Sequence, residues 1–171
     1  MIPIYIGTYT DGASKGIYRL ELDRANARLS KPVLVAEAVN PSLLAWHPSR
    51  PVLYAVSETN TVGAGKTGAL LAYSVGADGT LGLINKESSG GAGACFVSVH
   101  STGTHAFVAN YSAGSVAAFP IRADGGVSAA SALVKHSGSS AHPTRQKGPH
   151  AHAIRTAPGG AFVLAADLGA D

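Results

Sequence analysis

The stretch CFVSVHSTGTHAFVANY, residues 95–111, decides the fold. Two runs rich in apolar and β-branched residues flank a Ser-Thr-Gly turn, a pattern that predicts an antiparallel β-hairpin. The same design occurs in PSLLAWHPSRPVLYAVSE (41–58) and AHAIRTAPGGAFVLAADL (151–168). Equivalent polar residues near the ends of these hairpins lie 53 and 57 residues apart: Ser57, Asn110 and Asp167. This spacing is typical of the four-stranded blade of a β-propeller.

A second element alternates with the hairpins, and each copy opens with glycine. The copies are GIYRLELD (16–23), GALLAYSVGADGTL (68–81) and GSVAAFPIRADGGV (114–127). Each predicts a third strand and a tight turn, and the stretch after the turn predicts an outermost strand. In Ala77-Asp78-Gly79 and Ala123-Asp124-Gly125, glycine supplies the positive φ that such a turn requires.

We therefore predict an all-β chain that forms a partial β-propeller of four-stranded antiparallel blades. The chain begins at 4–9 with the second strand of a blade and ends after the second strand of the fourth repeat, which gives about three and a half blades. Residues 1–171 are expected to be one incomplete propeller domain. The alternative built from the same hairpins is a compact β-sandwich. Sheet edges exposed at both ends predict self-association, or pairing with the missing half of the propeller.

Composition excludes several classes of protein. Hydrophobic residues make up 46% and charged residues 13% of the 171 residues, as in a globular chain. The net charge is +3 without any Lys/Arg-rich run, so a nucleic-acid partner is not expected. No apolar stretch is long enough to span a bilayer, so no membrane partner is expected either. A single cysteine and the absence of a secretory leader predict a cytoplasmic location.

Polar residues gather where the second strand of each hairpin ends and the first strand begins, because antiparallel geometry places both at one rim. They are Thr8, Asn40, Ser57, Glu58, Cys95, Asn110, Tyr111, His150, His152 and Asp167. The loop HSGSSAHPTRQKGPHAH (136–152) is the longest polar connector and leads to the same rim. Its Arg145 and Lys147, with Lys135 before it, suit a small anionic substrate, especially a phosphate. The alternative is a solvated surface loop.

The pair His150 and His152 has the alternation that directs both side chains to one face of a strand. Imidazole titrates near neutral pH, so a general base is the preferred interpretation, with a structural histidine as the alternative for one of the two. A metal is not expected, because no third ligand occurs at a diagnostic spacing. Glu58 and Asp167 are expected to orient a histidine or a sugar hydroxyl, or simply to cap turns.

Two further residues at the rim have a structural alternative. Asn110 either binds substrate or hydrogen-bonds the backbone of the next loop. Cys95 precedes apolar Phe96 and Val97, which favours a small buried residue over a nucleophile.

Six segments resemble the 6-phosphogluconolactonase family of seven-bladed propellers, in the order in which that family carries them. They are IGTYT (6–10), NPSLLAWHP (40–48), YAVSE (54–58), FVANYSAGSV (107–116), RQKGPHAH (145–152) and ADLGAD (166–171). The most specific is RQ-x-x-PHAH followed by DLGAD. Ser57 departs from the pattern, because the family usually has asparagine before the acid.

The resemblance implies a cytoplasmic lactonase without metal or cofactor, which opens a sugar-phosphate δ-lactone, namely the 6-phosphogluconolactone of the pentose phosphate pathway. It also implies a polar channel cluster, which comprises Glu58, Asn110, Arg145, Gln146, His150, His152 and Asp167. In the leading hypothesis His152, or else His150, removes a proton from water while Arg145 binds the phosphate or the developing oxyanion. Gln146, Asn110, Asp167 and Lys147 are expected to bind the substrate. The alternatives are a related muconate-type lactonizing enzyme and a non-catalytic propeller that binds a protein or small ligand on its rim.

Overall fold

The computed structural model describes residues 1–60, 65 and 67–170, whose strands form four antiparallel sheets. The first sheet contains β1 (Ile2–Ile6), β2 (Gly16–Asp23), β3 (Arg28–Leu29) and β4 (Val33–Glu37). The second contains β5 (Leu44–Trp46), β6 (Val52–Ser57), β7 (Ala69–Val75) and β8 (Leu81–Ser88). The third contains β9 (Ala94–Val99), β10 (His105–Asn110), β11 (Ser115–Pro120) and β12 (Ala132–Lys135). The fourth contains β13 (Ala151–Thr156) and β14 (Val163–Asp167).

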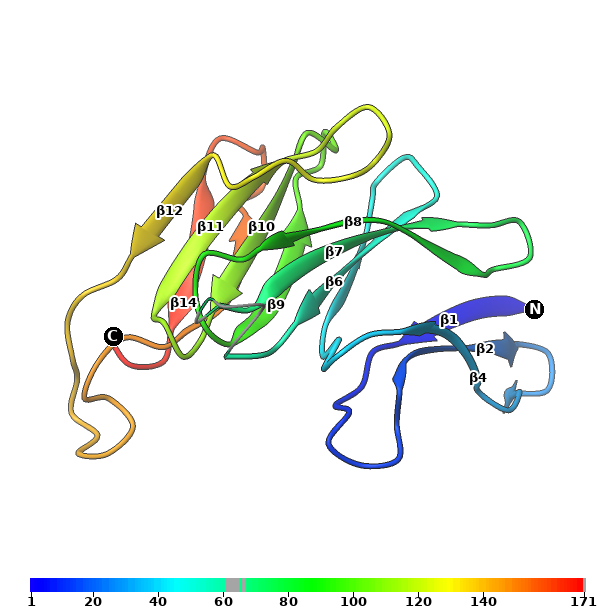
Figure 1. Cartoon of the computed structure of the whole chain (residues 1–171), viewed down its shortest axis with the longest axis horizontal. Helices are drawn as coiled ribbons and strands as arrows, with labels where there is room; N and C mark the ends of the chain where they lie inside the picture. The colour runs from blue at the N-terminus through cyan, green and yellow to red at the C-terminus, as the bar shows by residue number, and fades with distance from the viewer. Residues whose placement is uncertain (61–64, 66, 171) are drawn as a thin grey trace.

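The order of strands confirms the partial propeller. In the second and third sheets each strand pairs with the next one along the chain, so the sheets are meanders with β5 and β9 at one edge. The hairpins expected at 41–58, 95–111 and 151–168 are β5–β6, β9–β10 and β13–β14. The four sheets follow one another around an arc, from the N-terminal sheet to the C-terminal one (Figure 1). Among the described residues, no helix has the length and apolar character needed to cross a membrane.

The hydrophobic core lies between successive sheets, not within one layer. One cluster joins the first two sheets around Ile17 and Tyr73, and a second joins the middle sheets around Tyr54 and Phe119. A third, around Ile154, joins the last two sheets. Strand β6 is therefore buried at every position, since alternate side chains face different neighbouring sheets.

A tyrosine of the first sheet binds a turn of the second, and a tyrosine of the second binds a turn of the third. The Tyr5 hydroxyl donates to the Gly79 carbonyl at 2.8 Å, and the Tyr54 hydroxyl donates to the Gly125 carbonyl at 2.9 Å. Both glycines have positive φ, 82° and 89°. A side chain at Gly125 would also come within 2.7 Å of Val52 Cγ2, so glycine is needed there both for the turn and for the close approach.

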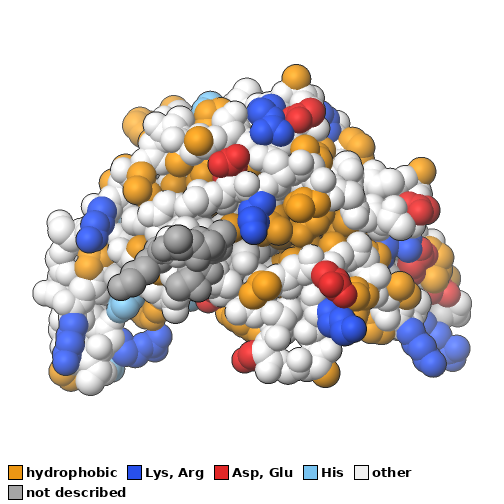
Figure 2. Space-filling model, in the orientation of Figure 1, with side chains coloured by type: hydrophobic (Ala, Val, Ile, Leu, Met, Phe, Trp, Pro, Cys, Tyr) orange, Lys and Arg blue, Asp and Glu red, His pale blue; other side chains and the backbone are white. Residues whose placement is uncertain are grey.

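The fourth sheet ends the arc with an open side. Strand β14 pairs with β13, and within the described residues no other strand pairs with it. Phe162 and Leu164 are 72% and 63% exposed, in contrast to the fully buried interior of β10. The space-filling view shows that the lower margin of the molecule curves inward between the two ends of the arc (Figure 2).

Candidate active site

A hollow of about 250 Å³ lies where the inner strands of the blades begin. It is lined by Tyr9, Ser42, Glu58, Cys95, Tyr111 and His152. These six residues occupy only two kinds of place in the repeat. Three of them stand at the start of a blade's first strand: Ser42, Cys95 and His152. The other three come after the second strand of a blade: Glu58 and Tyr111 follow its last residue directly, and Tyr9 lies three residues beyond Ile6, where β1 ends.

Two of these side chains stand at irregularities in the ladder. Between β9 and β10, Phe96 pairs with Ala109 but Ala94 pairs with Asn110, so Cys95 is an extra residue. Between β13 and β14, His152 is the extra residue in the same way. A β-bulge changes the direction of the side chain that it carries, and bulges are common beside active sites. The bulges account for the placing of a thiol and an imidazole next to each other on this rim.

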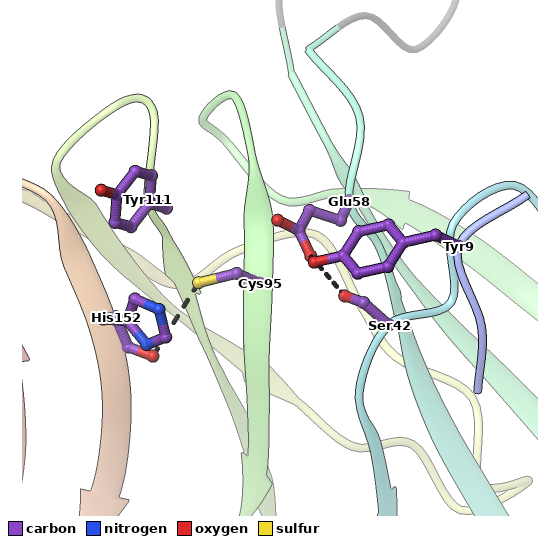
Figure 3. Close-up of a pocket in the computed structure, with 6 residues that line it drawn as sticks. All are labelled: Tyr9, Ser42, Glu58, Cys95, Tyr111 and His152. Carbon is purple, nitrogen blue, oxygen red and sulfur yellow. Dashed lines mark hydrogen bonds between the residues drawn. The ribbon is translucent and has the colours of Figure 1, made fainter. Parts of the chain in front are cut away.

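Glu58 forms one side of the hollow and is held by two hydroxyl groups. Tyr9 Oη donates to Glu58 Oε2 at 2.9 Å, and Ser42 Oγ donates to the same oxygen at 2.5 Å (Figure 3). The hydrogen bond with the Glu58 carboxylate raises the pKa of Tyr9, because the bond favours the protonated phenol. Tyr9 is thus a neutral donor at the pH of the cell.

His152 forms the opposite side, next to Tyr111 (Figure 3). The two rings meet edge to face, with centroids 5.5 Å apart. Neither ring nitrogen of His152 has a hydrogen-bond partner among the described residues. The His150 ring, by contrast, is stacked on the Tyr111 ring, with centroids 4.6 Å apart. Its Nδ1 lies 3.2 Å from the Tyr111 carbonyl oxygen. Of the two imidazoles, only that of His152 lines the hollow.

Cys95 lies between Glu58 and His152 (Figure 3). Its Sγ approaches the carbonyl oxygens of Ala109 and Ala151 at 3.7 Å. Burial, reinforced by the Glu58 charge, raises the pKa of the thiol to about 11. The thiol therefore stays protonated and is a poor nucleophile, which agrees with the expectation from sequence.

In the second, third and fourth blades, the last residue of the second strand does not line this hollow and instead hydrogen-bonds a neighbouring loop. Ser57 Oγ donates to the Val39 carbonyl at 2.7 Å. Asn110 is fully buried, and its Nδ2 donates to the Ser89 carbonyl at 3.0 Å. The structure therefore does not bring Asn110 to the hollow, where substrate binding was expected; it has the structural role that was the alternative.

Asp167 is the residue that hydrogen-bonds the neighbouring loop in the fourth blade. Its Oδ1 accepts the backbone N–H groups of His150 at 2.6 Å and Gly169 at 2.8 Å, and its Oδ2 lies 2.6 Å from His136 Nδ1. Only 10% of the Asp167 side chain is exposed. These contacts tie both ends of the long loop to β14. Asp167 does not line the first hollow but lines a second one, described next.

A second hollow, of about 460 Å³, adjoins His152 from the loop side. It is lined by Arg145, His152, Ala166, Asp167 and Leu168. The Arg145 guanidinium makes no hydrogen bond or ion pair with the described residues, so it is free to meet an anion. Basic and histidine side chains gather around this loop at the lower left of Figure 2.

The neighbours of Arg145 have different places. Gln146 is part of the loop's own framework: its Oε1 accepts the His142 N–H at 2.8 Å, and its Nε2 donates to the Leu168 carbonyl at 2.9 Å. Lys147 and Lys135 are exposed and line neither hollow. Among the described residues, no group of three or more His, Cys, Asp or Glu side chains is arranged to hold a metal ion.

The structure thus brings together Glu58, Cys95, Tyr111 and His152, and places Arg145 beyond His152. Tyr9 and Ser42 also line the hollow and were missed from the sequence. Their signal was the repeat itself, because Tyr9 is equivalent to Glu58 and Tyr111, and Ser42 is equivalent to Cys95 and His152. Aligning the repeats by one further position would have found both.

The arc of blades and the polar hollow at the start of their inner strands define a partial β-propeller with a candidate site on its rim. The chain belongs to the family described as Lactonase, 7-bladed beta-propeller, whose model matches residues 3–171. The 6-phosphogluconolactonase of Bacillus subtilis (strain 168) is 35% identical over 168 residues, which are 98% of this chain and 46% of that protein.

Two solved structures share the fold throughout. The periplasmic gluconolactonase PpgL of Pseudomonas aeruginosa is 34% identical with a TM-score of 0.89, over 98% of this chain and 47% of that one. A protein from Lactobacillus plantarum is 30% identical with a TM-score of 0.87, over 99% and 47%. The chain spans about half the length of the relatives that it matches.

Proposed function

We propose that this protein hydrolyses a sugar lactone, with His152 as the general base. The observation that carries the proposal is that His152 lines both hollows, with Glu58 on one side and Arg145 on the other. The His152 imidazole, which has no hydrogen-bond partner among the described residues, thus lies between the Glu58 carboxylate, which can accept hydrogen bonds from hydroxyl groups, and the Arg145 guanidinium, which can bind an anion. Names of relatives, a 6-phosphogluconolactonase and a gluconolactonase, support the same substrate class.

The polarity of the site orients a phosphorylated lactone. The phosphate would lie at Arg145, whose planar guanidinium can donate two parallel hydrogen bonds. The hydroxyl-bearing side of the ring would lie toward Glu58, and the carbonyl carbon beside His152. This arrangement keeps the substrate's negative charge away from the Glu58 carboxylate and favours 6-phosphogluconolactone, an intermediate of the pentose phosphate pathway, as the substrate.

The reaction needs one proton transfer in each direction. His152 removes a proton from water while the oxygen of that water attacks the carbonyl carbon, which gives a tetrahedral oxyanion. When the oxyanion collapses, the bond to the ring oxygen breaks and the imidazolium returns the proton to that oxygen. The products are the open-chain hydroxyl group and a carboxylic acid, which ionises. With the phosphate at Arg145, this guanidinium holds the substrate in place; the alternative role for Arg145 is to provide positive charge near the developing oxyanion.

The test is acid release in a pH-stat from 6-phosphogluconolactone and glucono-δ-lactone, by the protein at the full length that its gene encodes. Loss of a general base typically costs about a hundred- to ten-thousandfold in rate, so His152→Ala is expected to lose nearly all turnover above the spontaneous rate. His105→Ala is the matched control, because His105 stacks on Phe107 outside both hollows.

Two results would count against the proposal. Wild-type turnover in His152→Ala would remove this histidine from the mechanism. No release above background by the wild-type protein, with either lactone, would favour a propeller that binds a ligand without catalysis.

A further inference from the structure

The Glu58 carboxylate is held asymmetrically. Both hydroxyl donors, from Tyr9 and Ser42, bind Oε2, at 2.9 Å and 2.5 Å. Oε1 accepts no hydrogen bond from the residues that the structure describes. In Figure 3 this second oxygen points across the hollow, toward the side of Cys95, Tyr111 and His152. One oxygen is thus fixed by the protein, and the other is presented to whatever fills the hollow.

The backbone on both sides of this arrangement is fixed by one residue, Asn40. Its Oδ1 accepts the N–H of Thr10 at 2.8 Å, and its Nδ2 donates to the Glu58 carbonyl at 3.2 Å. Its own carbonyl accepts the Glu58 N–H at 2.9 Å. Asn40 has a φ of 44°, a left-handed conformation that asparagine adopts more readily than most residues. The segments that carry Tyr9 and Glu58 are therefore attached to the same point.

The chemistry of Oε1 determines what can bind it. An ionised carboxylate only accepts hydrogen bonds, so its partner must be a donor. No Lys or Arg lines this hollow among the described residues, so the charge has no cation beside it, and an anionic group would be repelled. A neutral hydroxyl group satisfies both conditions, and a hydrogen bond to a charged acceptor is among the stronger ones.

We infer that Tyr9 and Ser42 are positioning residues that turn Glu58 Oε1 into the receptor for a hydroxyl group of the bound lactone. The site therefore selects polyhydroxylated lactones over unsubstituted ones. The inference rests on the proposed lactone hydrolysis and assigns its specificity to residues outside the His152 machinery.

The experiment measures hydroxyl preference, defined as kcat/KM for glucono-δ-lactone divided by kcat/KM for δ-valerolactone, with the protein at its full encoded length. In Glu58→Gln, Tyr9 and Ser42 still require an acceptor, so the amide oxygen faces them and the NH₂ group faces the substrate. A donor then replaces the acceptor, and the preference is expected to fall about ten- to a hundredfold. Tyr9→Phe is expected to lower it about three- to tenfold, because one of two donors is lost.

Two controls separate positioning from general damage. Tyr5→Phe also removes a hydrogen-bonded hydroxyl, the one that reaches Gly79, but lies outside the hollow and is expected to keep the wild-type preference. Ser42→Ala is expected to lower the preference, and Ser42→Thr, which keeps a hydroxyl, to restore it. In a Glu58→Ala background Tyr9→Phe should change the preference no further.

The inference is overturned if the hydroxyl preference stays at the wild-type value in Glu58→Gln and Tyr9→Phe, which includes the case in which kcat/KM falls by the same factor for both lactones. If the wild-type protein hydrolyses neither lactone, the proposed reaction fails and calorimetry tests the receptor separately. Glucono-δ-lactam should then bind more tightly than 2-piperidone, with the difference reduced in Glu58→Gln. Equal affinities, or no binding of either lactam, would overturn the receptor itself.

Discussion

Replacing Asp167 with alanine is predicted to destabilise the fourth blade and the loop that carries Arg145. The variant loses three hydrogen bonds to a carboxylate that is only 10% exposed: those from the His150 amide, the Gly169 amide and the His136 ring. Each hydrogen bond to a charged group contributes about 1.5–3 kcal/mol, but bonds that share one acceptor do not add fully. We expect a loss of about 3 kcal/mol, which lowers Tm by about 6–12 °C in a domain of this size.

The loss should depend on pH. Burial by itself raises the pKa of Asp167, but hydrogen bonds from His150, His136 and Gly169 outweigh it and hold the pKa below the ordinary value of 3.8. The stabilisation is therefore complete above pH 3.8 and disappears as the pH falls through the lower folded-state value. In urea unfolding, the free energy of unfolding of Asp167→Ala should be lower than that of wild type by the whole expected amount at pH 7. This difference in free energy should decrease at acid pH.

Asp11→Asn provides the comparison for Asp167→Ala. Asp11 is exposed and makes no hydrogen bond with the described residues, so its substitution is expected to change stability by less than about 0.5 kcal/mol. The reasoning would be refuted if Asp167→Ala unfolded at the same temperature as Asp11→Asn. It would also be refuted if the difference in unfolding free energy between wild type and Asp167→Ala stayed constant down to acid pH.

Three other predictions concern substrate binding, thiol chemistry and assembly. Arg145→Ala should raise KM at least about tenfold for 6-phosphogluconolactone and less for glucono-δ-lactone, while Lys147→Ala, which lines neither hollow, should have the smaller effect in steady-state assays. Cys95 should react with iodoacetamide at pH 8 far more slowly than a free thiol, because burial raises its pKa to about 11; mass spectrometry over time measures this. The 171-residue chain alone should self-associate through the edge of β14, so its mass in sedimentation velocity should rise with protein concentration, and Leu164→Lys should reduce that rise.

The fold was accessible from the sequence because its signals are local. Alternating apolar residues and glycine turns define each hairpin, and three copies of one hairpin define a blade repeat without any long-range information. Gly79 and Gly125 have the positive φ expected for their turns. The sequence pattern does not predict that the turns at Gly79 and Gly125 accept hydrogen bonds from tyrosines of the preceding sheets.

The site was harder to predict, because a difference of one residue decides which way a side chain faces. Asn110 ends its strand and is buried, while the next residue, Tyr111, lines the hollow. A polar residue at a strand end is a candidate for substrate binding or for a structural brace, and only the neighbouring loop decides between them. The bulges at Cys95 and His152 also decide which way a side chain faces. They could not be predicted, because the sequence of one strand does not reveal a change of register with its partner.

The use of the same two places in successive blades has a consequence for how such a site can diverge. The second and third blades each supply one side chain from the start of the inner strand and one from just past the second strand, the first blade supplies Tyr9 and the fourth His152. None of these positions belongs to the cores between the sheets. Chemistry and architecture are thus encoded at separate positions of each repeat. Serine, cysteine and histidine already occupy one and the same place in three blades, so a new reactivity can be acquired one blade at a time on an unaltered framework.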